Sequence, residues 1–318
     1  MAAKTNRREF MKTGLITTAA VFASGPAALF GADSSLAQAT TQNAPDLVIS
    51  HGSNPATMTR AAVDTLGGMT RFVKTGAKVV IKPNMSFASG PQSASNTHPA
   101  VVSEVAKMCA EAGASRISIL DNVLQNPQDC LSYSKIPEQC QTIPNASVRV
   151  IKEQRLFREV KVEKGVLIKS MGVASEVLDA DVLIAVPVGK THSVAGVSLS
   201  MKGMMGLVFD NDRRTFHTNG MHESIVDMVT VLKPHLVVID GTRILASGGP
   251  TGPGEVLPLN VIIASTDLVS ADAQMVMLGT WHGQKLRPDQ VKYIKIAAER
   301  GLGRMDLDKL NVRNITVS

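Results

Sequence analysis

Histidine and lysine side chains gather in one stretch of the sequence, residues 180–222. An apolar run at 181–186 leads into this stretch and predicts a buried strand, and residues 222–232 have the pattern of a helix. Imidazoles bind transition metals or transfer protons, and lysines bind carboxylates and phosphates. The stretch therefore predicts a site for a small anionic ligand. The side chains that carry this chemistry are Lys190, His192, Lys202, His217 and His222.

Other polar side chains follow buried strands that are predicted elsewhere in the chain. The apolar runs at 46–50, 78–82, 116–121, 236–240 and 259–264 alternate with helical segments such as 55–70, 99–112 and 268–278. This alternation predicts an α/β fold, a mostly parallel sheet with helices on both faces, arranged either as one body or as two lobes around a cleft. In such sheets ligands bind at the carboxyl ends of the strands. The polar residues at those ends are Lys82, Asn84, Asp121, Lys190 and Asp240.

Several of these residues have a structural alternative. His98 lies between Thr97 and Pro99 at a good helix start, so it is either a helix cap or an acid/base group. Asp121, Asp227 and Asp240 either orient histidines by accepting a hydrogen bond from the imidazole or cap neighbouring helices. Met201, Met204 and Met205 fill the core more readily than they form a cofactor wall.

The first forty residues have the pattern of an export signal. NRREFMK at 6–12 matches the twin-arginine motif, a weakly apolar stretch follows, and AQA at 37–39 is a small-x-small cleavage site. We expect a signal peptide at 1–39 with cleavage near Ala39, a linker at 40–45 and the α/β domain at 46–318, with 122–147 as a candidate lobe boundary. The twin-arginine export machinery is then a partner and the periplasm the destination, and no later segment is long enough to span a membrane.

Composition narrows the function further. Aromatic residues make up only 3% of the chain and the net charge of +6 is scattered, which argues against base stacking and nucleic-acid binding. The chain has three cysteines and no CxxC, so we expect no iron–sulfur cluster and no Cys-ligated zinc in it. Cys109 fits a buried thiol, whereas Cys130 and Cys140 flank a polar segment and are able to pair after export.

The motifs of the chain resemble those of domain of unknown function family 362 (DUF362). They are KPN at 82–84, THP at 97–99, ADVLIAVPVGKTHSVAGVSLSMKGMMGL at 180–207, R-x-x-H at 214–217, HESIVD at 222–227 and VVIDG at 237–241. Many members of that family carry ferredoxin-type cysteine clusters, which this chain lacks. The resemblance implies, as one alternative, a partner subunit of an iron–sulfur redox complex.

A shorter segment resembles the nickel-pincer lactate racemases. His192, Ala195, Gly196 and Ser198 precede Lys202 at the spacing of that family, although Leu199, Ser200 and Met201 replace its glycines. The resemblance implies a nickel-bearing cofactor attached to Lys202, with His98 and His192 as the acid/base pair. It also implies His217 as a metal ligand, and His222 is the further candidate on our own reading. Lys82, Asn84, Lys190 and Ser198 are then expected to bind the anionic ligand.

These observations predict an exported protein that binds a small anionic ligand and transforms it, by proton or hydride transfer, with a metal or metal-bearing cofactor. The second alternative is a non-catalytic periplasmic protein that binds an anion or a metal. The catalytic hypothesis requires His98 and His192 to face one cavity. A cleft rich in lysine without paired histidines favours the binding protein.

Overall fold

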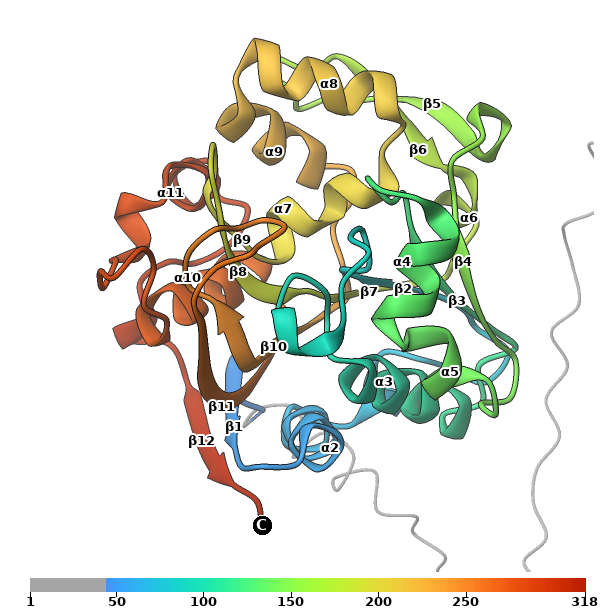
Figure 1. Cartoon of the computed structure of the whole chain (residues 1–318), viewed down its shortest axis with the longest axis vertical. Coiled ribbons are helices and arrows are strands. Elements are labelled where there is room, and N and C mark those ends of the chain that lie inside the picture. The colour runs from blue at the N-terminus through green and yellow to red at the C-terminus, as the bar shows by residue number, and fades with distance from the viewer. Residues whose placement is uncertain (1–43) are drawn as a thin grey trace, which may run out of the picture. The chain divides into compact units, whose positions relative to one another are not determined.

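A ten-stranded mixed sheet runs through residues 44–318, the part of the chain that this computed structural model describes (Figure 1). The strand order is β12-β1-β11-β10-β7-β2-β3-β4, and β8 and β9 form a branch on β10. The predicted signal peptide and most of the predicted linker lie outside the described residues, so the structure says nothing about export.

Five neighbouring strands form a parallel block, as the sequence predicts. They are β10 (Leu236–Leu245), β7 (Val182–Val186), β2 (Lys78–Pro83), β3 (Arg116–Asp121) and β4 (Ala146–Val150). The remaining long strands complete the sheet beyond β10. β11 (Val256–Ser265) is antiparallel to β10, β1 (Leu47–His51) is antiparallel to β11, and β12 (Val312–Thr316) is parallel to β1. The carboxyl ends of the parallel block therefore share one edge.

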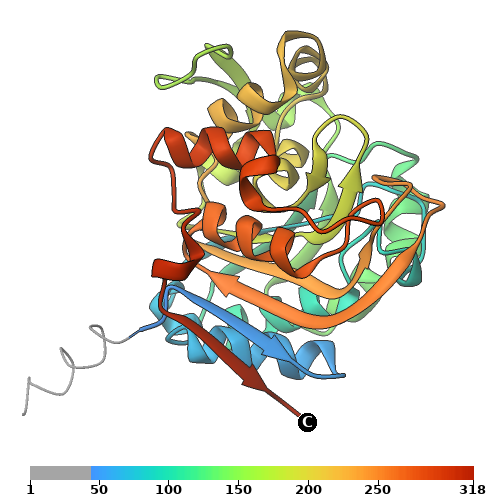
Figure 2. The ribbon, with the colours of Figure 1, turned by 90° about the vertical axis from the view of Figure 1, so that its left-hand side faces the viewer.

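Helices cover both faces of the sheet (Figure 2), which confirms the predicted fold class. Both faces need covering because the strands are apolar on both sides. In β2, for example, Val79 and Ile81 belong to the core on one face and Val80 to the core on the other. The first face carries α2 (Pro55–Thr65), α3 (Pro99–Glu111), α4 (Pro127–Ser134) and α5 (Ile136–Cys140). The second face carries α7 (Ser200–Gly203), α9 (Met221–Val229), α10 (Leu268–Leu278) and α11 (Lys292–Glu299).

Smaller elements complete the chain. A two-stranded ribbon of β5 (Phe157–Lys161) and β6 (Ser170–Ala174) is followed by α6 (Ser175–Leu178), and α8 (Asp210–Asn219) precedes α9. Short 3₁₀ helices lie at η1 (Met69–Arg71), η2 (Pro91–Ser93), η3 (Gln154–Leu156), η4 (Met204–Leu207), η5 (Pro288–Gln290) and η6 (Leu307–Lys309). No helix of the described residues is long and apolar enough to cross a membrane.

The candidate lobe boundary at 122–147 holds α4 and α5, and α5 packs against α3 within a single compact unit. Cys109 of α3 is a buried free thiol, as the sequence predicts. Cys130 and Cys140 are also buried and free in the structure. Burial raises the pKa of Cys109 and of Cys140 to about 12, so these thiols are poorly reactive.

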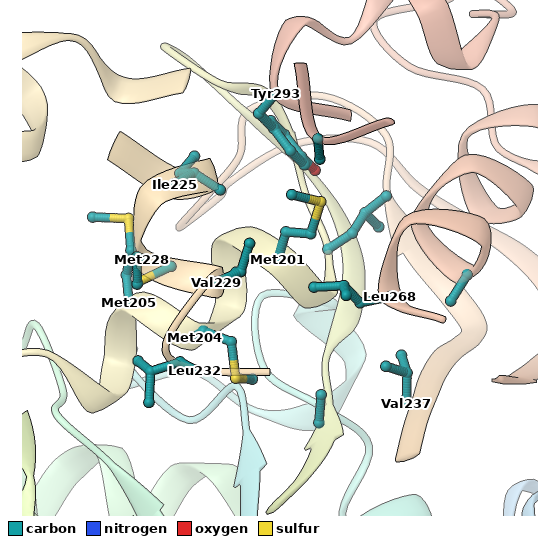
Figure 3. Packing of buried hydrophobic residues seen from close by; sticks show 14 of the residues in the cluster. Met201, Met204, Met205, Ile225, Met228, Val229, Leu232, Val237, Leu268 and Tyr293 are labelled. Atoms are coloured by element: carbon teal, nitrogen blue, oxygen red, sulfur yellow. The ribbon is translucent and has the colours of Figure 1, made fainter. Parts of the chain in front are cut away.

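The segment that follows β7 forms a hairpin and then two short helical turns. β8 (Val188–His192) pairs with β9 (Gly196–Ser198), and α7 and η4 come directly afterwards. Met201, Met204 and Met205 of this segment pack with Met228 of α9 in the core (Figure 3), which confirms the core-filler prediction for Met201 and Met204. Their packing fixes the helical turn that carries Lys202. Met205 belongs to the core and also lines the cavity described below.

Candidate functional site

A cavity of about 250 Å³ opens where β2 and β3 end and the β8–β9 hairpin begins. Side chains from distant parts of the chain converge on it, as expected for the carboxyl edge of a parallel sheet. The predicted residues that line it are Lys82, Asn84, Asp121, Lys190, His192, Ser198, Lys202 and His217. The larger hollow of about 610 Å³ lies along the other ends of β2 and β3 and contains none of the predicted site residues.

An ion pair forms the floor of the cavity. Lys82 Nζ lies 3.1 Å from Asp121 Oδ1, and both side chains are almost completely inaccessible to solvent. Asp121 Oδ2 accepts hydrogen bonds from the Met85 amide and the Ser86 hydroxyl, at 3.0 and 2.8 Å. Burial lowers the pKa of Lys82 and nearby Arg213 lowers it further, whereas Asp121 raises it. Such a pair costs desolvation energy, so it fixes the position of the lysine more than it stabilises the fold.

Gly206 of η4 leaves the space that this ion pair occupies. A Cβ atom on this residue would lie 2.1 Å from Asp121 Oδ1 and 2.3 Å from Lys82 Cε. Any larger residue must therefore displace the pair. Gly203, on the same helical segment, would meet only ordinary contacts, at 3.7 and 3.8 Å.

Lys190 reaches the cavity from the middle of β8. Its Nζ donates a hydrogen bond of 2.5 Å to the Ser95 carbonyl and lies 4.8 Å from the centre of the Phe87 ring. Burial, followed by the repulsion of Lys202, holds its pKa well below the usual value. Ser198 lies opposite Lys190 in the hairpin register and is also buried.

Lys202 is the cationic side chain of the cavity that has no partner among residues 44–318. Its Nζ makes no hydrogen bond or ion pair with any residue of the described chain. Burial lowers its pKa to about 8, and Arg213 and Lys82 add to that shift by repulsion. Lys202 is thus a mixture of ammonium and amine near neutral to mildly alkaline pH.

A buried carboxyl group holds the turn on which Lys202 lies. Asp272 of α10 accepts hydrogen bonds from the backbone amides of Ser200 and Met201, at 2.8 and 3.1 Å, and so caps the start of α7. Burial raises the pKa of Asp272 to about 7. Sequence patterns do not predict this contact, because Asp272 and Met201 are 71 residues apart in the chain.

Arg213 is the fourth cationic side chain of the lining, and the sequence analysis did not predict it as a site residue. It lies on α8, four residues before His217, so that both side chains share one face of the helix and line the cavity. Arg213 Nη1 donates a hydrogen bond of 2.7 Å to the Asn122 carbonyl and lies 3.5 Å from Asp210. Burial lowers the pKa of Arg213, and Asp121 and Asp210 oppose that shift. The i, i+4 spacing of Arg213 and His217 was the available signal.

His192 has one ring nitrogen occupied by backbone. Its Nδ1 accepts hydrogen bonds from the amides of Val194 and Ala195, both at 3.2 Å, in the turn between β8 and β9. The ring proton must then be on Nε2. Burial lowers the pKa of His192 to about 3, with contributions from Lys202 and Lys190, so the ring is neutral at ordinary pH. His192 therefore offers the cavity a hydrogen-bond donor and not a base.

The other predicted residues lie outside the cavity lining. His98 caps α3, with its Nδ1 accepting a hydrogen bond of 3.2 Å from the Ala100 amide, so the structure shows the helix-cap alternative. His222 stacks on Tyr293 with ring centres 6.4 Å apart. His98 therefore does not line the cavity that His192 lines.

Asp121, Asp227 and Asp240 accept hydrogen bonds from backbone amides, and for Asp240 that amide lies at the start of α3. Asp227 accepts hydrogen bonds from the backbone amides of residues 166–168 and pairs with Arg300. Asp240 accepts one from the backbone amide of His98, not from its ring, and pairs with Arg243. Among the described residues none of the carboxylates of Asp121, Asp227 and Asp240 accepts a hydrogen bond from an imidazole.

The predicted metal ligands His217 and His222 do not form a ligand set in residues 44–318. Within that range no group of three or more His, Cys, Asp or Glu side chains is placed to hold a metal ion. His217 is exposed at the cavity mouth, whereas His222 faces Tyr293.

Comparisons with known proteins agree with the sequence motifs. The chain belongs to domain of unknown function family 362, whose model matches residues 79–277 and so includes every residue that lines the cavity. A curated relative from Synechocystis, thylakoid-associated protein sll1697, is 25% identical over 224 residues, which cover 67% of this chain and 66% of that protein.

Two solved structures are similar at low identity. The lactate racemase apoprotein from Thermoanaerobacterium thermosaccharolyticum shares 12% identity at a TM-score of 0.47, over 73% of this chain and 57% of that one. A protein from Thermotoga maritima shares 9% identity at a TM-score of 0.45, over 77% of this chain and 60% of that one. At these values neither likeness supports an inference about function.

Proposed function

We propose that this protein binds a small anionic ligand, a carboxylate or a phosphate, in the cavity at the carboxyl edge of the sheet. The supporting observation is the charge of the lining, in which four cationic side chains face one carboxylate. The four are Lys82, Lys190, Lys202 and Arg213. Buried like charges repel one another, and an anion among them relieves that repulsion.

The contacts assign a different part to each group. Lys82 is committed to Asp121 and Lys190 to the Ser95 carbonyl, so neither amino group is left free for the ligand. Lys202 has no partner in the described part of the chain and supplies the ammonium that contacts the ligand. His192 adds the Nε2 proton as a neutral donor, because its Nδ1 accepts from the hairpin turn. The site thus combines charge with directed hydrogen bonds.

Lys202 is also the residue able to act chemically on a bound ligand. With a pKa of about 8, part of the side chain is the neutral amine at mildly alkaline pH, and an amine serves as base or nucleophile. The proposal does not use His98, which lies outside the cavity lining. Catalysis is therefore a second candidate that depends on Lys202 alone among the predicted catalytic residues.

A cofactor on Lys202 remains part of that second candidate. The unpaired amine fits a point of covalent attachment, but the described residues place no metal ligand set beside it. Intact-mass measurement and elemental analysis of protein from its native cell test the idea. An unmodified Lys202 without stoichiometric nickel, zinc or iron excludes it.

The proposed location is the periplasm, reached by the twin-arginine route. The support is the sequence pattern at residues 6–39, and the test is cell fractionation of the wild-type chain beside a variant in which Arg7 and Arg8 are both replaced by lysine. We expect the variant to stay in the cytoplasm. An unchanged distribution would contradict export by this route.

Isothermal titration calorimetry with phosphate, oxalate, lactate and citrate at pH 7 tests the anion-binding proposal. We expect at least one anion to bind, with affinity that falls as salt increases. Lys202→Met should weaken that binding at least tenfold, whereas Lys107→Met, which removes an exposed lysine of α3, should not change it. Binding of none of these anions, or equal affinity in the two variants, would refute the proposal.

A further inference from the structure

A second hollow adjoins the cavity beside α8. It has a volume of about 280 Å³ and is lined by Leu124, Lys152, Asp210, Arg213, Arg214 and His217. Three of these residues, Leu124, Arg213 and His217, line the first cavity too. The two hollows are therefore neighbouring compartments that share one wall.

Of the three residues that line both hollows, Arg213 is held in place, whereas Leu124 and His217 are exposed. Arg213 is buried and tied to the Asn122 carbonyl, so it stays between the compartments and presents charge to both. His217 and Leu124 are exposed, and Leu124 is 57% accessible to solvent. A ligand that occupies the inner cavity is thus able to extend past these two side chains into the outer hollow.

The outer hollow also carries positive charge. Lys152 Nζ pairs with Asp210 at 2.7 Å and donates to the Val123 carbonyl at 3.0 Å, so its charge is largely matched. Asp210 Oδ1 in addition accepts a hydrogen bond of 2.9 Å from Asn122. Arg214 is exposed and makes no hydrogen bond or ion pair with any described residue. Its guanidinium is the group of the outer hollow left for an anion.

We infer that the ligand of this protein carries two anionic groups joined by a short spacer. One group occupies the inner cavity beside Lys202, and the other occupies the outer hollow beside Arg214, with Arg213 between them. The inference rests on the proposed anion-binding function and narrows the ligand to a class of dianions. A carboxylate or a phosphate at either end satisfies the same contacts.

A series of matched acids tests this inference. Straight-chain dicarboxylates of four to eight carbons are titrated into the full chain beside the monocarboxylates of the same length, at fixed ionic strength. We expect one dicarboxylate length to bind at least tenfold more tightly than its monocarboxylate. Arg214→Glu should reduce that preference about tenfold and leave the monocarboxylate affinity within twofold. Arg313→Glu, which makes the same charge change at an exposed position of β12, should leave both affinities unchanged.

The possible results separate this inference from the proposed function. Equal binding of monocarboxylates and dicarboxylates, with loss of both in Lys202→Met, would overturn the two-compartment inference and keep the anion site. A preference for dicarboxylates that Arg214→Glu does not reduce would also overturn it. If no acid of either kind binds, the two-compartment inference is overturned, and the titration with phosphate decides the proposed function separately.

Discussion

Replacing Gly206 by alanine tests the ion pair on which the cavity floor depends. The added Cβ would lie 2.1 Å from Asp121 Oδ1 and 2.3 Å from Lys82 Cε, well inside van der Waals contact. Both partners are buried, so neither has room to move without breaking the pair. Disrupting a buried pair costs roughly 3–5 kcal/mol. Replacing glycine by alanine in a helical turn gains up to about 1 kcal/mol. We therefore expect a net loss of about 2–4 kcal/mol in the free energy of unfolding.

The matched control is Gly203→Ala, three residues earlier on the same segment. Its Cβ would meet Pro187 and Asn84 at 3.7 and 3.8 Å, which are ordinary contacts. We expect this variant to be as stable as the wild type or up to about 1 kcal/mol more stable. Urea unfolding followed by circular dichroism gives both values, and titration with the best-binding anion reports whether the cavity survives. Equal stability of the two variants would refute the account of the cavity floor.

Three further predictions concern the titratable groups. His192 should remain a neutral ring with its proton on Nε2 between pH 5 and pH 8, because its pKa is about 3; nitrogen-resolved NMR of the imidazole that showed titration near pH 6.5 would contradict this. Anion affinity should fall by up to about tenfold for each pH unit above 8 as Lys202, with a pKa of about 8, loses its proton, and calorimetry should find this pH dependence absent in Lys202→Met. Burial raises the pKa of Asp272 to about 7, so its protonated form stabilises the fold fully below about pH 4 and progressively less as the pH rises to 7. Urea unfolding between about pH 4 and pH 7 should therefore show a falling free energy of unfolding in the wild type. Asp272→Asn, which cannot titrate, should not show this decline.

The sequence placed the strand ends correctly for a physical reason. Apolar runs that end on Lys82, Asp121 and Val186 behave as buried parallel strands, and parallel strands bring their carboxyl ends to one edge. The polar residues that follow these apolar runs therefore lie together at that edge. This argument needs only the period of the pattern and the direction of the strands.

The sequence missed the elements that have no apolar period of their own. The hairpin of β8 and β9 carries Lys190 and His192, and these polar residues interrupt the apolar pattern by which a buried strand is predicted. Similarly, α8 is polar along most of its length, so neither the helix nor the inward position of Arg213 was predicted. Both elements form because tertiary contacts hold them, and those contacts join residues far apart in the chain.

Residue roles were harder to predict than residue positions. His98 was open to two interpretations, and its ring bonds the Ala100 amide at the start of α3. For His192 the location was predicted correctly, but the turn amides at Nδ1 make it a donor and not a base. Such roles depend on which nitrogen is already occupied, and a list of residue types does not contain that information.

The most direct test of the anion site is an anomalous diffraction measurement on crystals soaked in bromide or in tungstate. The charge of the lining predicts the strongest peak inside the cavity, within contact distance of Lys202 Nζ and near Arg213. Lys202→Met should abolish that peak and leave any surface peaks unchanged. Peaks confined to the outer surface, or an undiminished cavity peak in Lys202→Met, would contradict the role that we assign to Lys202.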